Sequence, residues 1–251
     1  MKPIVFFLLS IALLSCSRKK IIIKSEEDFY YMWPKQYEKV FGHIKSIVES
    51  NYDADPKMSS LSYKTLFQYD SIGNEIGILS FYPDGRLHWV ACSYYHNGKL
   101  NETDYYNSDT VLRMKITYTY DGKGNLIQSN EKSDQAISKS IYKNDNNGYM
   151  NEILHYDPND SLEYRLIFKR DNNGNIIEDI SEGIVHTDNI RKYDSIGNEI
   201  ERLYVKSDGG LGSTGQIQYK DYDKAGNWLT GIVLVHNKPS SIRKREIEYY
   251  R

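Results

Sequence analysis

The stretch 112–125 reads LRMKITYTYDGKGN, which joins a regular alternation to a turn. Apolar or aromatic residues stand at 112, 114, 116, 118 and 120, and polar residues occupy the positions between them. A period of two residues is typical of a half-buried β-strand. The letters DGKGN (121–125) then supply the residue types that reverse a chain. The stretch therefore predicts a strand that ends in a tight turn.

The same turn recurs along the chain. Aspartate can cap a turn with its own carboxylate, and glycine and asparagine tolerate the positive φ that a reversal needs. Shorter or degenerate copies follow Tyr82, Tyr95, Tyr106, Tyr142, Tyr156 and Arg170. The full pattern Tyr-Asp-x-x-Gly-Asn gives the turn residues that we interpret as structural: Tyr69, Asp70, Gly73, Asn74, Tyr120, Asp121, Gly124, Asn125, Tyr193, Asp194, Gly197, Asn198, Tyr222, Asp223, Gly226 and Asn227.

The repeated strand and turn predict an all-β fold. Sequential strands joined by tight turns form an antiparallel meander of β-hairpins. The long steps from 120 to 142, from 170 to 193 and from 193 to 222 are read as two units with an unmarked turn inside each. We expect about twelve to fourteen strands in one large sheet that is twisted or curled, open or barrel-like.

The N-terminus carries a secretion signal. Met1-Lys2 is a short basic start, and residues 4–14 are apolar apart from Ser10. A transmembrane helix needs about 20 apolar residues, so this run fits a signal peptide instead. Leu13-Leu14-Ser15-Cys16 resembles a bacterial lipobox, which implies cleavage before Cys16 and lipidation of that cysteine. The alternative is an ordinary signal peptide that happens to contain a cysteine.

These features divide the chain into a signal peptide (1–15), a lipidated N-terminus and linker (16–41) and a β-sheet domain (42–251). Trp33-Pro34 argues against a long helix in the linker, although a short one is expected near 36–41. Alternation over 43–52 favours a first strand there. Ser17 directly after Cys16 is similar to lipoproteins sorted to the outer membrane, and which face of that membrane the domain occupies is left open.

Composition excludes several functional classes. The net charge of -2 provides no field to attract nucleic acid or an anionic bilayer. Hydrophobic residues make up 39% of the chain, which is enough for a packed core. Only 2 cysteines are present, so a disulfide scaffold is excluded, and Cys92 is interpreted as a buried, inert thiol.

Three sequence patterns resemble sites for a dinucleotide, calcium or zinc but lack the spacing or context that these sites need. Residues 210–215 match G-x-G-x-x-G, but a strand-like segment follows where a dinucleotide site needs a helix, so a hairpin loop is expected. The loops at Asp145 and Asp171 lack the spacing of calcium ligands and are read as turns. The six histidines show no zinc-ligand spacing, although His88 and His155 could still meet across the sheet. We therefore predict no metal and no cofactor.

The charged residues on the expected strands indicate neither a catalytic site nor a membrane-spanning barrel. Glu199 and Glu201 are expected on one strand face, where charges more commonly serve solubility than a glycosidase site. No Gly-x-Ser-x-Gly elbow occurs in the sequence. A spanning barrel is disfavoured because charged residues such as Lys115 and Arg165 occupy mid-strand positions. We predict that the protein is not an enzyme.

The repeats resemble a known family. The Tyr-Asp-x-x-Gly-Asn units are similar to the YD repeats of Rhs-type proteins, and most closely to short bacterial YD-repeat lipoproteins. The units after Tyr82 and Tyr95 also resemble MORN-type repeats. The resemblance covers about residues 63–251 and implies a β-repeat architecture. Such repeats serve as shells, binding surfaces and spacers, so the resemblance implies no single activity.

The sequence therefore predicts a lipid-anchored envelope protein that acts by binding or by structure. A tyrosine-rich sheet suits sugars or extended peptides, because flat rings offer contact area at low entropy cost. Trp33, Trp89 and Trp228 are candidate binding residues, and a position in the core is the preferred alternative for all three. An enzyme acting on envelope polysaccharide and a passive subunit of a larger envelope assembly are the alternatives. The expected partners are the membrane, through the lipid, and a glycan or envelope protein; oligomeric state is left open.

Overall fold

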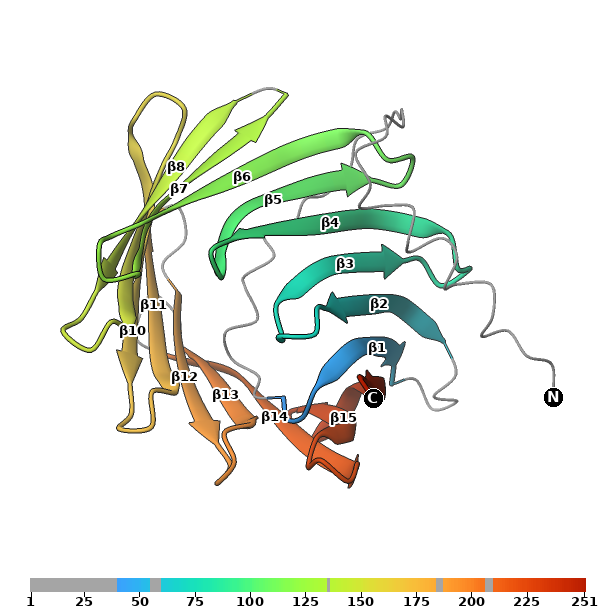
Figure 1. Ribbon diagram of the computed structural model, residues 1–251. Helices are drawn as coiled ribbons and strands as arrows, with labels where there is room; N and C mark the ends of the chain where they lie inside the picture. Colours follow the sequence, from blue (N-terminus) through green and yellow to red (C-terminus); the bar gives the residue numbers. More distant parts are fainter. Residues whose placement is uncertain (1–39, 55–59, 135, 184–186, 206–209) are drawn as a thin grey trace.

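The computed structural model describes residues 40–54, 60–134, 136–183, 187–205 and 210–251 (Figure 1). These form a single antiparallel meander in which each strand pairs with the next along the chain. The strands are β1 (Ile44–Asp53), β2 (Leu61–Tyr69), β3 (Glu75–Phe81), β4 (Leu87–His96), β5 (Lys99–Asn107), β6 (Leu112–Tyr120), β7 (Leu126–Ser133), β8 (Ile137–Asn144), β9 (Met150–Tyr156), β10 (Leu162–Arg170), β11 (Ile176–Gly183), β12 (Thr187–Tyr193), β13 (Glu199–Val205), β14 (Leu211–Tyr222), β15 (Trp228–Val235) and β16 (Lys238–Tyr249).

The sheet closes into a barrel, which corrects the predicted twisted or curled sheet. Strand β1 pairs with β16 from Ile44↔Tyr249 to Asp53↔Ser241, so no edge strand remains in the sheet that the described residues form. Closure satisfies the backbone groups that an edge strand would expose. Local sequence patterns could not predict this closure, because β1 and β16 lie at opposite ends of the domain.

The predicted number of strands is also too low, since the barrel has 16. The connections β7–β8, β11–β12, β13–β14 and β15–β16 carry no Tyr-Asp motif. The first three of these lie inside the long steps, so the unmarked turns inferred there are confirmed. The first strand expected over 43–52 is confirmed as β1, whereas most of the short helix near 36–41 lies outside the described residues.

The motif-bearing turns gather at one end of the barrel. In a meander every second turn lies at the same end, and the connections β2–β3, β4–β5, β6–β7, β8–β9, β10–β11, β12–β13 and β14–β15 therefore form one rim (Figure 1). We call it the aspartate rim. Its turns are 70–74, 97–98, 121–125, 145–149, 171–175, 194–198 and 223–227.

A single hydrogen-bond pattern builds these turns. In the copy at 194–198, the Asp194 carboxylate accepts the backbone N–H groups of Ile196 (3.0 Å) and Asn198 (2.8 Å) and the Asn198 side-chain amide (2.8 Å). Gly197 has a φ of 92°, a backbone conformation that L side chains rarely adopt. Five other rim turns repeat the two backbone bonds, from Asp70, Asp121, Asp145, Asp171 and Asp223.

The recurring tyrosines join neighbouring hairpins at this rim. The Tyr120 hydroxyl donates to the Leu100 carbonyl (2.8 Å), which lies just beyond the preceding rim turn. Tyr193 donates in the same way to Ile176 (2.7 Å). Where the sequence departs from tyrosine, Asn144 and Arg170 donate to the equivalent carbonyls. In these two copies the tyrosine of the motif is therefore a hydrogen-bond donor between repeats.

The two faces of the sheet differ in burial. Cross-strand register places Glu49, Thr65, Ser129, His155 and Arg191 on one face, and all of them are buried. We assign this face to the barrel interior, because side chains that converge inside a closed wall shield one another. The other face carries exposed ion pairs such as Lys169–Glu178 (2.7 Å) and is the outer wall.

Apolar clusters complete the packing. Two lie on the inner face, around Phe67 and around Phe168. A third, around Val90 and Cys92, lies on the outward side of β3 and β4, and Cys92 is fully buried within it.

The glycine-rich segment at 210–215 corrects another prediction. It was expected to be a loop, but 211–215 belongs to strand β14. The Tyr204 ring lies against Gly212, where a β-carbon would clash with it. Glycine is therefore required in this strand by a covering aromatic ring.

Candidate functional site

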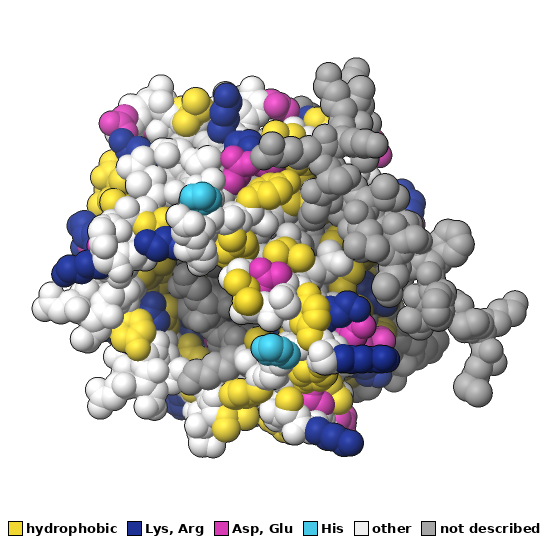
Figure 2. Space-filling model, viewed as in Figure 1, with side chains coloured by type: hydrophobic (Ala, Val, Ile, Leu, Met, Phe, Trp, Pro, Cys, Tyr) yellow, Lys and Arg dark blue, Asp and Glu magenta, His cyan; other side chains and the backbone are white. Residues whose placement is uncertain are grey.

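The aspartate rim surrounds a polar mouth. Seen from the same side as Figure 1, the space-filling surface is hollowed in the region that these turns encircle (Figure 2). A cleft of about 680 Å³ opens between the turns 171–175 and 194–198. Its lining consists of Asp171, Asn173, Asn175, Ile177, Arg191, Lys192, Tyr193, Asp194, Ser195 and Gly197. We call it the first mouth cleft.

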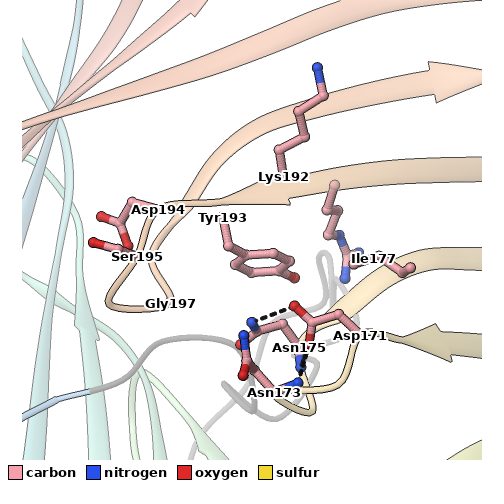
Figure 3. A pocket seen from close by; sticks show the side chains of 10 residues that line it. Asp171, Asn173, Asn175, Ile177, Lys192, Tyr193, Asp194, Ser195 and Gly197 are labelled. Carbon is pink, nitrogen blue, oxygen red and sulfur yellow. Dashed lines mark hydrogen bonds between the residues drawn. The ribbon is translucent and has the colours of Figure 1, made fainter.

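Amides, a hydroxyl and one aromatic ring dominate this cleft. The Tyr193 ring lies beside Asn175, Asp171 is bonded within its own turn, and Lys192 points away (Figure 3). The hydrogen bond from Tyr193 to Ile176 holds the ring in place. Burial raises the pKa of Tyr193, with Arg191 partly offsetting it, so the hydroxyl stays protonated at neutral pH. The cleft therefore presents a fixed ring and several polar side chains.

The charges beside the cleft pair with one another. The Arg191 guanidinium lies 2.5 Å from Asp179 and 3.6 Å from Glu199. Arg202 donates to both carboxylate oxygens of Glu199 (2.7 and 2.8 Å). Burial raises the pKa of Asp179, and Arg191 counteracts that rise. Since these charges neutralise each other, the neutral polar side chains are left to contact a ligand.

A second mouth cleft adjoins the first. Its volume is about 320 Å³, and it lies between the turns 145–149 and 171–175. The lining residues are Asp145, Asn147, Tyr149, Asn151, Phe168, Arg170, Asp171 and Asn172. Asp171 lines both clefts, so the two share one turn.

A belt of hydroxyl groups crosses the inner wall. Ser129 and Tyr142 lie 2.9 Å apart, and Ser140 lies 3.0 Å from Nδ1 of His155. The His155 ring stacks on Tyr164 at 4.6 Å and is 4% exposed. Burial lowers the pKa of His155, with Glu163 opposing it, so the imidazole is neutral at pH 7. Stacking and burial make this belt part of the packed wall.

The structure separates several residues that the sequence grouped. Glu199 contacts Arg202 on the inner face, whereas Glu201 pairs with Lys192 on the outer wall, so the expectation that the two glutamates share a face is wrong. His88 lies on β4 beside Tyr82, and His155 lies on β9, so these histidines do not meet.

The candidate tryptophans differ in their surroundings. Trp228 is 2% exposed, with the Arg245 guanidinium 3.5 Å from the ring centroid, so it packs in the wall and offers no surface to a ligand. Trp89 is half-buried on the inner face of β4. Trp33 and Cys16 lie outside the described residues, and lipidation stays a prediction.

The predicted turn residues are brought together, but the clefts between them were missed. Tyr69, Tyr120, Tyr193 and Tyr222 all lie at the aspartate rim, and Tyr222 is largely exposed. No sequence motif marks Asn173, Arg191 and Ser195 as neighbours. These residues approach one another only when β10–β13 pair. In the described ranges, no group of three or more His, Cys, Asp or Glu side chains is arranged to hold a metal ion.

No helix in the described part of the chain is long and apolar enough to cross a membrane.

Comparisons with known proteins show the fold alone. No protein-family model and no curated protein matches the chain. The structure is similar to a porin-like protein from Bacteroides uniformis, with a TM-score of 0.58 and 10% identity over 82% of this chain and 98% of that one. The crystal structure of TcdB2-TccC3-TEV matches 75% of this chain and 10% of that chain at 16% identity, with a TM-score of 0.35.

Proposed function

We propose that this chain is a lipid-anchored barrel of the bacterial outer membrane that binds a polyhydroxylated ligand, a glycan, at its mouth. The observation that carries the proposal is the first mouth cleft, with its fixed Tyr193 ring among Asn173, Asn175 and Ser195. Aromatic rings pack on the flat faces of sugars, while amides and hydroxyls exchange hydrogen bonds with ligand hydroxyls. Binding of this kind requires no catalytic group.

Closure of the barrel favours a glycan over an extended peptide. Peptides commonly bind by adding a strand to a free sheet edge, where main-chain hydrogen bonds supply the affinity. Every strand of this barrel is paired on both sides, including β1 with β16. A ligand must therefore be recognised by side chains at the rim, and those side chains are mainly polar.

The charged side chains of the outer wall favour attachment through a lipid over a barrel that spans the membrane. A ladder of charge crosses the outer face of β8–β11, where Lys143 pairs with Glu152 (2.8 Å) and Arg165 contacts both Glu152 and Glu182 (2.5 and 3.2 Å). Each lysine or arginine on a lipid-facing wall would cost about 2–4 kcal/mol near the bilayer midplane. We infer that this wall faces water and that Cys16 supplies the membrane attachment.

Replacing Cys16 with alanine tests the anchor. We expect Cys16→Ala to move the folded protein from the membrane fraction to the soluble fraction, because the lipid supplies the attachment. Fractionation before and after an alkaline carbonate wash measures this, with the unaltered chain as the control. Retention of the variant in the washed membrane would show that the barrel itself is embedded.

Replacing Asn173 with alanine tests the cleft. The Asn173 side chain lines the cleft, while its backbone N–H bonds to Asp171, so the variant keeps the turn. We expect about tenfold weaker binding to any glycan captured on an array, equivalent to one lost hydrogen bond. Asn159→Ala is the matched control, because Asn159 holds the same position in a turn of the opposite rim. Equal binding by the two variants, or capture of no glycan, would overturn the proposed function.

A further inference from the structure

We infer that the ligand is a linear polysaccharide strand that lies along the aspartate rim and occupies successive clefts between turns. This inference rests on the proposed function and deepens it by naming the form of the glycan. The carrying observation is that the two mouth clefts are neighbours that share the turn 171–175, with Asp171 lining both.

The clefts repeat because the hairpins repeat. Each is bounded by the third residue of a rim turn, Asn147 in the second mouth cleft and Asn173 in the first. Each also contains a tyrosine, although at different places in the repeat: Tyr149 ends its turn in the second cleft, and Tyr193 precedes its turn in the first. Adjacent rim turns are two strands apart, which is roughly 9–10 Å. A ligand built from repeating units can therefore meet the same kind of contact more than once.

The surface between the two clefts is fixed. Arg170 donates to the carbonyls of Gly174 (2.9 Å) and Met150 (3.0 Å), which ties the two turns together. Its guanidinium lies 5.4 Å from the centroid of the Tyr149 ring. A β-carbon at Gly174 would lie 3.1 Å from the Tyr149 hydroxyl, so the ring packs directly on the next turn. Little ordering cost is then expected when a ligand crosses from one cleft to the other.

The exposure of Tyr149 supports a ligand that extends from the first mouth cleft into the second. Its side chain is 47% exposed although it is held by Arg170 and Gly174. A fixed and exposed ring suits stacking against a sugar that extends beyond the first mouth cleft. A single small sugar would fill one cleft and leave this ring uncovered.

A chain-length series tests the inference with the full-length mature protein. Isothermal titration would use malto- and cello-oligosaccharides from disaccharide to octasaccharide as probes. Linked contacts raise affinity when the linker spans both sites. We expect at least a tenfold gain in affinity between the disaccharide and the hexasaccharide of the series that binds.

Three variants show which cleft provides the gain in affinity. Tyr149→Ala should remove most of that gain, whereas Asn173→Ala should weaken binding of every length. Asn147→Ala, a milder change in the same cleft, should act in the direction of Tyr149→Ala if the latter alters folding. A constant affinity across lengths, or full retention of the gain in both Tyr149→Ala and Asn147→Ala, would overturn the extended path and leave the single-cleft function standing. Failure of every oligosaccharide to bind would overturn the proposed function together with this inference.

Discussion

Replacing Arg245 with methionine should reduce the free energy of unfolding by about 3–5 kcal/mol, the largest loss expected of any substitution considered. Arg245 pairs with Glu49 at 3.0 Å where β16 meets β1, and their side chains are 2% and 8% exposed. The methionine would remove the Arg245 guanidinium from the buried Glu49 carboxylate. It would also remove the guanidinium from the face of Trp228. Urea unfolding followed by circular dichroism measures the loss.

A second ion pair between the same strands is the matched control. Lys45 and Glu248 lie 2.8 Å apart with 41% and 52% of their side chains exposed. Exposed pairs contribute about 0–1 kcal/mol, so Lys45→Met should change stability little. The double variant Glu49→Gln, Arg245→Met should recover part of the loss, because the buried Glu49 charge is removed together with that of Arg245. Similar losses for Arg245→Met and Lys45→Met would contradict the buried closure.

Replacing Asp223 with alanine should cost about 2 kcal/mol, as expected for losing several hydrogen bonds to a partly exposed carboxylate. Asp223 accepts the backbone N–H groups of Ala225 and Asn227 (both 2.9 Å) and the Tyr249 hydroxyl. Asn227 in turn bonds to the backbone of Phe41 immediately before β1. The substitution therefore loosens one rim turn and the barrel closure together, and thermal unfolding should report it.

The dependence of this effect on pH has a definite sign. Burial alone would raise the pKa of Asp223, but hydrogen bonds from Tyr249, Asn227 and Ala225 outweigh it and lower the pKa. A carboxylate with a lowered pKa stabilises the fold above its unfolded pKa of about 3.9, and loses that effect as the pH falls through the folded value. The difference between Asp223→Ala and the unaltered protein should thus be full at pH 7 and shrink below pH 4.

Asp157 provides the control for this prediction. It accepts the same two backbone bonds, from Asn159 (2.8 Å) and Ser161 (2.9 Å), in a turn of the opposite rim. Among the described residues, no hydrogen bond from this turn reaches β1 or β16, the strands that close the barrel. Asp157→Ala should therefore have a clearly smaller effect, and an equal effect would show that Asp223 acts only through its own turn.

The repeated strand and turn could be predicted from the sequence because both are local. Asp194, Gly197 and Asn198 form their hydrogen bonds within five consecutive residues, and the inner-facing Met114, Ile116 and Tyr118 follow the alternation directly. The resemblance to YD repeats stays a prediction. The turn at 236–237, which carries no Tyr-Asp motif and lies outside the long steps, was not predicted, and the predicted strand count was too low.

Closure and the mouth clefts could not be predicted, because both depend on residues far apart in the chain. The pairing of Glu49 with Arg245 spans almost the whole domain. Arg191 and Asn173 reach one cleft only after β10 to β13 have paired in register. The orientation of Glu199 also depends on the irregular register after its turn, which overrides simple alternation.

The central claim, that glycans bind at the mouth of the barrel, is tested most directly by amide chemical-shift mapping. Titration of the isotope-labelled protein with malto- and cello-hexaose should shift the amides of Asn147, Asn173 and Ser195, which lie in the three turns around the two clefts. The turn at 157–161, on the opposite rim, should stay unchanged. Shifts confined to that opposite rim, or no shifts with either hexasaccharide, would contradict the account.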